Sequence, residues 1–255
     1  MTAGKMIGMA LVLLFTAAAP LGLMAWLHKK RGGRWLSFLI GALFFPVFAM
    51  MLEPLLHIIA LKSPLGAVMQ NNIWVLGLYG GLAAGLFEET GRLVAFKMVL
   101  RNEEAPVTAL SYGLGHGGME AFLLVGMAMV NNLLLGMLLM GGGEIPPELA
   151  EAADTLTATP AVLFLWSVLE RVSAMTVHAA NSVLVFAAVR TGKWLLFPAA
   201  ILLHAGMNFV AVVSAAFLPT AAVEGLVLAF ALLTAILAAK VYRGLVLQAD
   251  AREEL

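Results

Sequence analysis

Residues 112–122 read YGLGHGGMEAF, which places a histidine, His116, and a glutamate, Glu120, in a run that is otherwise apolar. This run covers about residues 105–140 and is therefore long enough to cross a bilayer, for which a helix needs ~20 residues. A charge at the centre of a bilayer costs about 2.5–3.5 kcal/mol even on insertion scales, so such side chains face the inside of a helix bundle. The stretch therefore predicts a membrane-spanning helix with a functional inner face.

The composition of the whole chain supports the same class. Of the 255 residues, 62% are hydrophobic and 12% are charged, and the mean hydropathy is +0.97. Soluble domains are roughly 45–50% apolar and about 25% charged, so we predict an all-α polytopic membrane bundle. The chain has no cysteine, so any metal must be held by histidine, carboxylate or amide groups. Its net charge of zero argues against a nucleic-acid partner.

The apolar segments predict about seven transmembrane helices in a single transmembrane domain. They cover approximately residues 5–27, 35–60, 72–97, 105–140, 160–189, 194–217 and 221–245. The first segment follows Lys5 and resembles a signal peptide, but its apolar stretch of about 22 residues is too long for one, so we expect a retained span. We expect a core at about 72–217, with flanking helices at 5–60 and 221–245.

Basic residues are divided unequally between alternate connections. One set, with the C-terminal end, holds Lys29, Lys30, Arg31, Arg34, Lys97, Arg101, Arg190, Lys193, Lys240, Arg243 and Arg252. The other set holds only Lys5 and Lys62. Because Lys and Arg accumulate on the cytoplasmic side, we predict an outside N-terminus and a cytoplasmic C-terminus.

Ionisable and amide side chains inside the segments are the candidate site residues. They are Glu88, Glu89 and Arg92 in the third segment, His116 and Glu120 in the fourth, Glu170, Arg171, His178 and Asn181 in the fifth, and His204 and Asn208 in the sixth. One residue from each segment, namely Glu88, His116, His178 and His204, falls roughly 13–17 Å below the predicted cytoplasmic boundary. We expect these four to meet. By the same count, Glu53 and His57 fall near the outer end of the second segment and are expected at the interface.

Helical spacing groups several of these residues on shared faces. Residues four apart lie on one face, as in Glu88–Arg92, His116–Glu120 and His204–Asn208. Each motif alone has a structural explanation, because a histidine among glycines can be a packed residue and Glu88–Arg92 can be an internal ion pair. Their agreement in depth favours a reaction site. Gly81, Ala84 and Gly85 share a stripe with Glu88 and predict a close neighbouring helix.

The motifs EETGR, YGLGHGGMEA, LERVSAMTVHAANS and HAGMN in consecutive segments resemble the YhfC family of bacterial intramembrane metalloproteases. That family is distantly related to the type II CAAX prenyl endopeptidases and to PrsW. The resemblance covers about residues 72–217. It implies that Glu88–Glu89 match paired catalytic carboxylates, that Tyr112-x-x-x-His116 matches a Phe-x-x-x-His motif, and that His204-x-x-x-Asn208 matches an oxyanion-stabilising motif. Arg92 comes one residue earlier than in the CAAX enzymes, which leaves open whether it pairs with Glu88 or Glu89.

Two mechanisms agree with this resemblance. In the metal version, His116, His178 and His204 bind Zn²⁺ with water in the fourth position. Zinc lowers the pKa of this water to about 7, and Glu88 or Glu89 takes its proton. In the metal-free version, Glu88 and His116 activate the water while His204 and Asn208 stabilise the oxyanion. The metal version is favoured by three histidines at one depth, with Arg92, Tyr112, Glu120, Glu170, Arg171 and Asn181 in support.

Two other classes of protein use buried ionisable groups in a similar way. A proton-coupled transporter places Glu and His near the midplane, and a non-catalytic membrane scaffold or immunity factor could retain the same fold. The sequence favours a protease of the bacterial cytoplasmic membrane. Its expected substrate is a membrane protein or a lipidated peptide, and the substrate sequence and the oligomeric state are not encoded in any motif that we find.

Overall fold

The computed structural model describes residues 1–253, and all regular elements in this range are helices. In chain order they are α1 (Ala3–Arg31), α2 (Trp35–Phe45), η1 (Pro46–Leu52), α3 (Glu53–Lys62), α4 (Pro64–Asn71), α5 (Ile73–Val94), η2 (Ala95–Val99), α6 (Val107–Glu120), η3 (Ala121–Gly126), α7 (Met127–Met140), η4 (Pro147–Leu149), α8 (Ala150–Ala158), α9 (Ala161–Thr191), α10 (Leu196–Ala215) and α11 (Thr220–Glu253). The prediction of an all-α polytopic fold is therefore confirmed. The connections before residues 72 and 160 contain the short helices α4 and α8.

Six helices within the described residues are long and apolar enough to cross a membrane. They are Ala3–Arg31, Trp35–Lys62, Val107–Met140, Ala161–Thr191, Leu196–Ala215 and Thr220–Ala251. The third predicted segment forms α5, which has 22 residues but is not among the six. Its apolar character is reduced by the charged residues Glu88, Glu89 and Arg92, all of which are buried. The predicted count of seven spans and the predicted orientation remain predictions.

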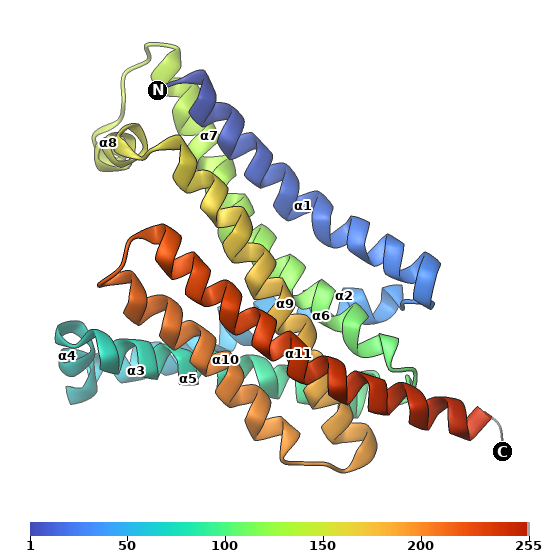
Figure 1. The fold of residues 1–255 in the computed structure, drawn as a ribbon. Coiled ribbons are helices and arrows are strands. Elements are labelled where there is room, and N and C mark those ends of the chain that lie inside the picture. Colours follow the sequence, from blue (N-terminus) through green and yellow to red (C-terminus); the bar gives the residue numbers. More distant parts are fainter. Residues whose placement is uncertain (254–255) are drawn as a thin grey trace.

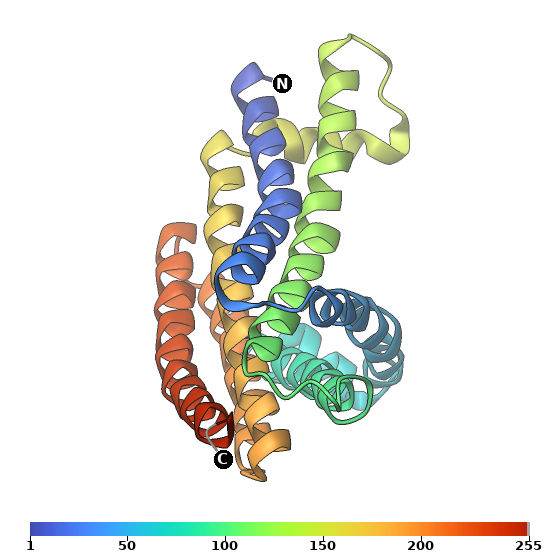
Figure 2. The same ribbon diagram turned by 90° about the vertical axis from the view of Figure 1, so that its right-hand side faces the viewer.

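Helix α9 runs through the middle of the molecule. In its most apolar 18-residue window, 78% is buried, against 22–33% in the other five candidate spans. Figure 1 shows α9 between α1 and α7 on one side and α10 and α11 on the other. In Figure 2, α2 and α5 are seen nearly end-on and cross the long axis of α9. The polar residues of α9 therefore face neighbouring helices on several sides.

Small residues allow the helices that carry the site to approach closely. A Cβ added at Gly81 of α5 would lie 2.4 Å from the backbone oxygen of Ala205 on α10. At Gly115 of α6, an added Cβ would lie 1.9 Å from the backbone oxygen of Phe38 on α2. The helix contact predicted from the stripe around Gly81 is thus found, and the partner is α10.

Three π-helical segments lie next to charged residues of the interior. Segment η1 ends directly before Glu53, η2 begins three residues after Arg92, and η3 begins directly after Glu120. A π-helical turn adds a residue to the turn and changes the face on which later side chains lie. Segment η1 precedes its charged residue and therefore helps to set the face on which Glu53 lies, whereas η2 and η3 follow Arg92 and Glu120. Such turns are frequent at functional sites.

Candidate metal centre

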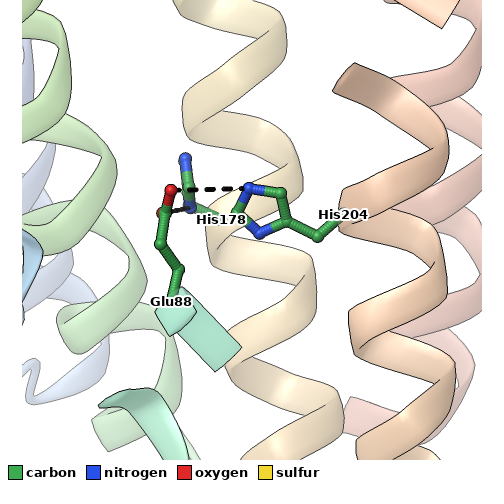
Figure 3. A group of neighbouring side chains, drawn as sticks. All are labelled: Glu88, His178 and His204. Atoms are coloured by element: carbon green, nitrogen blue, oxygen red, sulfur yellow. Dashed lines mark ion pairs between the residues drawn. The ribbon is translucent and has the colours of Figure 1, made fainter. Parts of the chain in front are cut away.

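Four helices bring one carboxylate and three imidazoles together inside the bundle. Glu88 of α5 is 5% exposed, and its Oε2 lies 2.8 Å from Nε2 of His116 on α6. The same carboxylate lies 3.9 Å from Nδ1 of His178 on α9 and 3.7 Å from Nε2 of His204 on α10. Figure 3 shows Glu88, His178 and His204 pointing toward one another from three separate helices. The expected convergence of the four side chains is therefore found.

A second carboxylate holds the ring of His178 from its other side. Nε2 of His178 forms an ion pair with Oε2 of Glu120 on α6. Arg171 in turn donates from Nη1 to Oε1 of Glu120 at 2.7 Å, and its Nη2 pairs with Glu170. This arrangement fixes the orientation of the imidazole across the interface between α6 and α9. Of the adjacent residues Glu170 and Arg171, it is Arg171 that pairs across helices.

Glu89 holds the ring of His204 in the same manner. Its Oε1 accepts from Nδ1 of His204 at 2.8 Å and from Nδ2 of Asn181 at 3.1 Å. Its Oε2 forms an ion pair with Nη1 of Arg92. Both oxygens of Glu89 are thus engaged, and neither Glu89 nor Arg92 has any exposed surface. The partner of Arg92, left open by the sequence, is Glu89.

The hydrogen bonds determine which ring nitrogens are free to act as acceptors. A carboxylate only accepts, so His204 must donate from Nδ1 to Glu89 and His178 must donate from Nε2 to Glu120. In the neutral rings, the lone pairs are then on Nε2 of His204 and Nδ1 of His178. Both nitrogens face oxygens of Glu88. Three acceptor groups therefore converge, an arrangement that a cation stabilises.

The donor set fits a divalent metal. One ligand atom from each of Glu88, His178 and His204 can be chosen so that all three lie within 4.8 Å of one another. Two histidines and one glutamate form a known catalytic zinc ligand set, in which a fourth position is kept open. Histidine ligands normally donate their second ring nitrogen to a carboxylate or carbonyl, as both rings do here. The sequence suggested His116, His178 and His204 as the metal ligands. Among the described residues, the trio whose ligand atoms converge contains Glu88 instead of His116.

His116 and Arg92 lie directly beside this trio. The ring of His116 is 1% exposed and packs, tilted by 38°, at a centroid distance of 4.8 Å from the ring of His178. Its Nδ1 has no hydrogen-bond partner within the part of the chain that the structure describes. Nη2 of Arg92 lies 3.2 Å from Nδ1 of His178 and donates to the lone pair of that ring. A metal bound at this nitrogen would have to replace that contact.

A cavity of about 330 Å³ opens beside the trio. Its walls include Glu88, His178, His204 and Asn208, whereas Glu89 does not line it. Asn208 lies one turn after His204 on α10 and lines the same space. Of the two adjacent glutamates, Glu88 is therefore the one that a molecule in the cavity can reach.

The predicted supporting residues occupy different places around the cluster. Tyr112 is fully buried, and its ring lies 5.9 Å from that of His116 and 5.8 Å from the guanidinium carbon of Arg92. Its hydroxyl has no hydrogen-bond partner among residues 1–253. Tyr112 therefore packs against the cluster and is not part of the cavity wall. Asn181 supports Glu89, as described above.

Two carboxylates of the interior were not recognised from the sequence. The expectation that Glu53 is interfacial is wrong, because Glu53 is only 8% exposed and lines the same cavity as Glu88. Its Oε1 pairs with Nε2 of His57 at 3.1 Å, and Nδ1 of His57 lies 2.8 Å from the hydroxyl of Tyr79. Glu224 of α11 is also 8% exposed and interacts electrostatically with Glu170 and Arg171. A lone acidic residue inside the apolar run 221–245 was the available signal for Glu224.

Comparison with known proteins identifies the family of the chain. A family model described as YhfC intramembrane metalloprotease matches residues 14–238. An uncharacterized membrane protein YhfC from Bacillus subtilis (strain 168) is 34% identical over 203 residues, which cover 76% of this chain and 78% of the relative. No solved structure matches significantly. The chain is therefore a multi-pass membrane protein that belongs to the YhfC intramembrane metalloprotease family.

Proposed function

We propose that this protein is an intramembrane metalloprotease that hydrolyses a peptide bond of a membrane protein or lipidated peptide in the bacterial cytoplasmic membrane. The observation that carries the proposal is the convergence of Glu88, His178 and His204, in which the acceptor nitrogen of each ring lies within 3.9 Å of an oxygen of the carboxylate. The family description agrees with this reading of the donor set.

We assign the metal ligands to Glu88, His178 and His204, and zinc is the metal that this donor set favours. A divalent metal at this site supplies Lewis-acid activation of water and of the scissile carbonyl group. Glu120 and Glu89 keep the two imidazoles in the tautomers that direct their lone pairs inward. Arg171, Arg92 and Asn181 anchor these carboxylates in turn.

The proton of the attacking water also needs an acceptor. Glu88 has two oxygens, and its Oε2 lies 2.8 Å from Nε2 of His116. With one oxygen of Glu88 as the metal ligand, we assign the proton transfer to its other oxygen together with His116; Glu88 faces the cavity and His116 lies behind it. The pair can return the proton to the leaving amine, because a general base becomes a general acid in the second half of hydrolysis.

We assign stabilisation of the developing oxyanion to Asn208. Its side chain lines the cavity one helical turn from His204, and an amide N–H is a suitable donor to a negatively charged oxygen. Removal of one such donor from a protease costs about 10²–10³ in the rate of catalysis.

The experiment that tests the function does not require a known substrate. The full chain is expressed in a bacterial host, and new protein N-termini in the membrane fraction are identified by mass spectrometry after amine labelling. We expect cleavage sites in or beside transmembrane or lipidated segments with the wild type. These sites should be lost with Glu88→Gln and His204→Ala. They should be kept with His28→Ala, because the ring of His28 contacts the backbone oxygen of Gly33 and the ring of Trp35 and is not part of the cavity wall. Identical N-termini with and without Glu88 would contradict the proposal.

A further inference from the structure

A second, larger cavity lies on the far side of α9 from α5. It has a volume of about 770 Å³, is open to the outside, and is lined by residues of α1, α6, α9 and α11. Small and apolar side chains form its walls, among them Ala19, Leu114, Ala179 and Ala235. Figure 1 shows α1 and α11 diverging, with α6 and α9 between them. We call this cavity the apolar slot.

The length of the slot corresponds to one half of a bilayer. Its lining residues on α9 extend from Val172 to Val183, which is about 17 Å of helix. Those on α11 extend from Ala235 to Arg243, which is about 12 Å. One leaflet of a ~30 Å hydrocarbon core is about 15 Å thick. The slot therefore has the length of one leaflet and runs along the helix axes.

One end of the slot is basic. Tyr242 and Arg243 line this end, and Arg31 of α1 interacts electrostatically with Tyr242. The last turn of α1 consists of His28, Lys29, Lys30 and Arg31. The C-terminal ends of α1 and α11 lie on the same side of the molecule (Figure 1), which is the predicted cytoplasmic side. Basic pockets between transmembrane helices on this side bind the head groups of anionic lipids.

The size of the slot decides between a lipid and a helix as the occupant. The part of a transmembrane helix that crosses one ~15 Å leaflet fills a cylinder of roughly 1,200 Å³, about one and a half times the volume of the slot. An acyl chain is narrow and flexible, and it matches walls that are mostly apolar and have their charged side chain, Arg243, at one end. We infer that the slot binds an anionic phospholipid of the cytoplasmic leaflet, with an acyl chain between α1 and α11 and the phosphate at Arg243.

The test measures the lipid bound to the purified full chain by native mass spectrometry. The protein is titrated in detergent with dioleoyl phosphatidylglycerol or with the corresponding phosphatidylcholine. The wild type should retain phosphatidylglycerol in preference to phosphatidylcholine. Arg243→Ala should reduce this preference about fivefold, which corresponds to about 1 kcal/mol for one basic residue near the membrane surface. Lys240→Ala is the matched control, because Lys240 lies on the same helix outside the slot.

Variants that fill the slot test whether the acyl chain of the lipid lies in it. Ala239→Trp narrows the slot from α11, and Gly22→Trp narrows it from α1, where no heavy atom lies within 4 Å of an added Cβ. Either variant should abolish selective lipid retention, whereas Leu237→Trp, at an exposed position outside the slot, should not. Glu88→Gln should retain the lipid, so this result is independent of the proposed protease activity.

Three outcomes would overturn the inference. The first is equal retention of the two lipids by the wild type, and the second is wild-type retention by both Ala239→Trp and Gly22→Trp. The third is displacement of the lipid by inorganic phosphate alone or by a synthetic 20-residue transmembrane peptide, since this would assign the slot to a soluble anion or to a polypeptide.

Discussion

The two adjacent glutamates of α5 have different environments. Glu88 lines the cavity and faces His178 and His204, whereas Glu89 is fully buried between Arg92, Asn181 and His204. Helix geometry places successive side chains about 100° apart. It allows Arg92 to reach either glutamate, at i,i+4 or i,i+3. The neighbours on α9 and α10 decide the pairing, which is why the sequence left it open.

The buried pair of Glu89 and Arg92 is expected to be essential for stability. Substitution Arg92→Leu leaves the carboxylate of Glu89 buried without its charged partner, which costs about 3–5 kcal/mol in the free energy of unfolding. The measurement is thermal or denaturant unfolding of the purified protein in detergent.

The control for this prediction is Arg34→Ala. Arg34 pairs with Glu103 at 3.5 Å, and its side chain is 54% exposed, so solvent screens the pair and the expected loss is at most about 1 kcal/mol. Equal stability of the Arg92 and Arg34 variants would show that the buried pair has no special structural role.

At the scale of elements, the site depends on the close approach of α5 and α10. Gly81 and Gly85 of α5 lie against the backbone of Ala205 and Ile201 on α10. This contact brings two helices together along the stripe that ends in Glu88. It also accounts for the 3.7 Å separation between Glu88 and His204.

Neighbouring glycines of α5 provide a matched test of this contact. An added Cβ at Gly81 would lie 2.4 Å from the backbone oxygen of Ala205, but at Gly80 it would meet no heavy atom within 4 Å. Gly81→Ala should therefore separate the helices, reduce stability by about 1–3 kcal/mol and weaken metal binding. Gly80→Ala should be neutral or stabilising by about 0.5–1 kcal/mol, because alanine favours the helix. Unfolding and metal content measured on the two variants check this, and equal behaviour would contradict the role of Gly81.

Much of the element structure was predictable, and the exceptions have physical causes. Apolar runs set the helix positions within a few residues, because spanning the bilayer fixes both length and composition. Depth counting brought His116, His178 and His204 together because it assumes regular helices, and those segments are regular up to these residues. The same assumption failed for Glu53. The sequence suggested a regular helix there, but Glu53 directly follows the π-helical segment Pro46–Leu52.

Considered as a whole, the molecule places its charges around a central helix in a bundle of apolar helices. His178, Asn181 and Arg171 all come from α9, which is the most buried of the candidate spans. The charged side chains of α5 also lower its mean hydropathy, so this helix, which we predicted as a span, is not among the six helices that are apolar enough to cross a membrane. The residues that build the site are the ones that weaken the membrane signal.

The orientation of the bundle is a prediction that cysteine labelling can test. The chain has no cysteine, so single cysteines are unique labels. Glu148→Cys, in the connection predicted outside, should react with a membrane-impermeant maleimide in intact cells. Asp250→Cys, near the C-terminus, should react only after the membrane is opened. The reverse pattern would show that the bundle is inverted.

The most direct test of the central claim is the metal content of the purified full chain, measured by inductively coupled plasma mass spectrometry after dialysis against zinc. We expect about one zinc per chain in the wild type and in His28→Ala. Glu88→Gln, His178→Ala and His204→Ala should lose the metal, while His116→Ala should retain it. A wild-type protein without bound metal, or three ligand variants with full zinc content, would contradict the account.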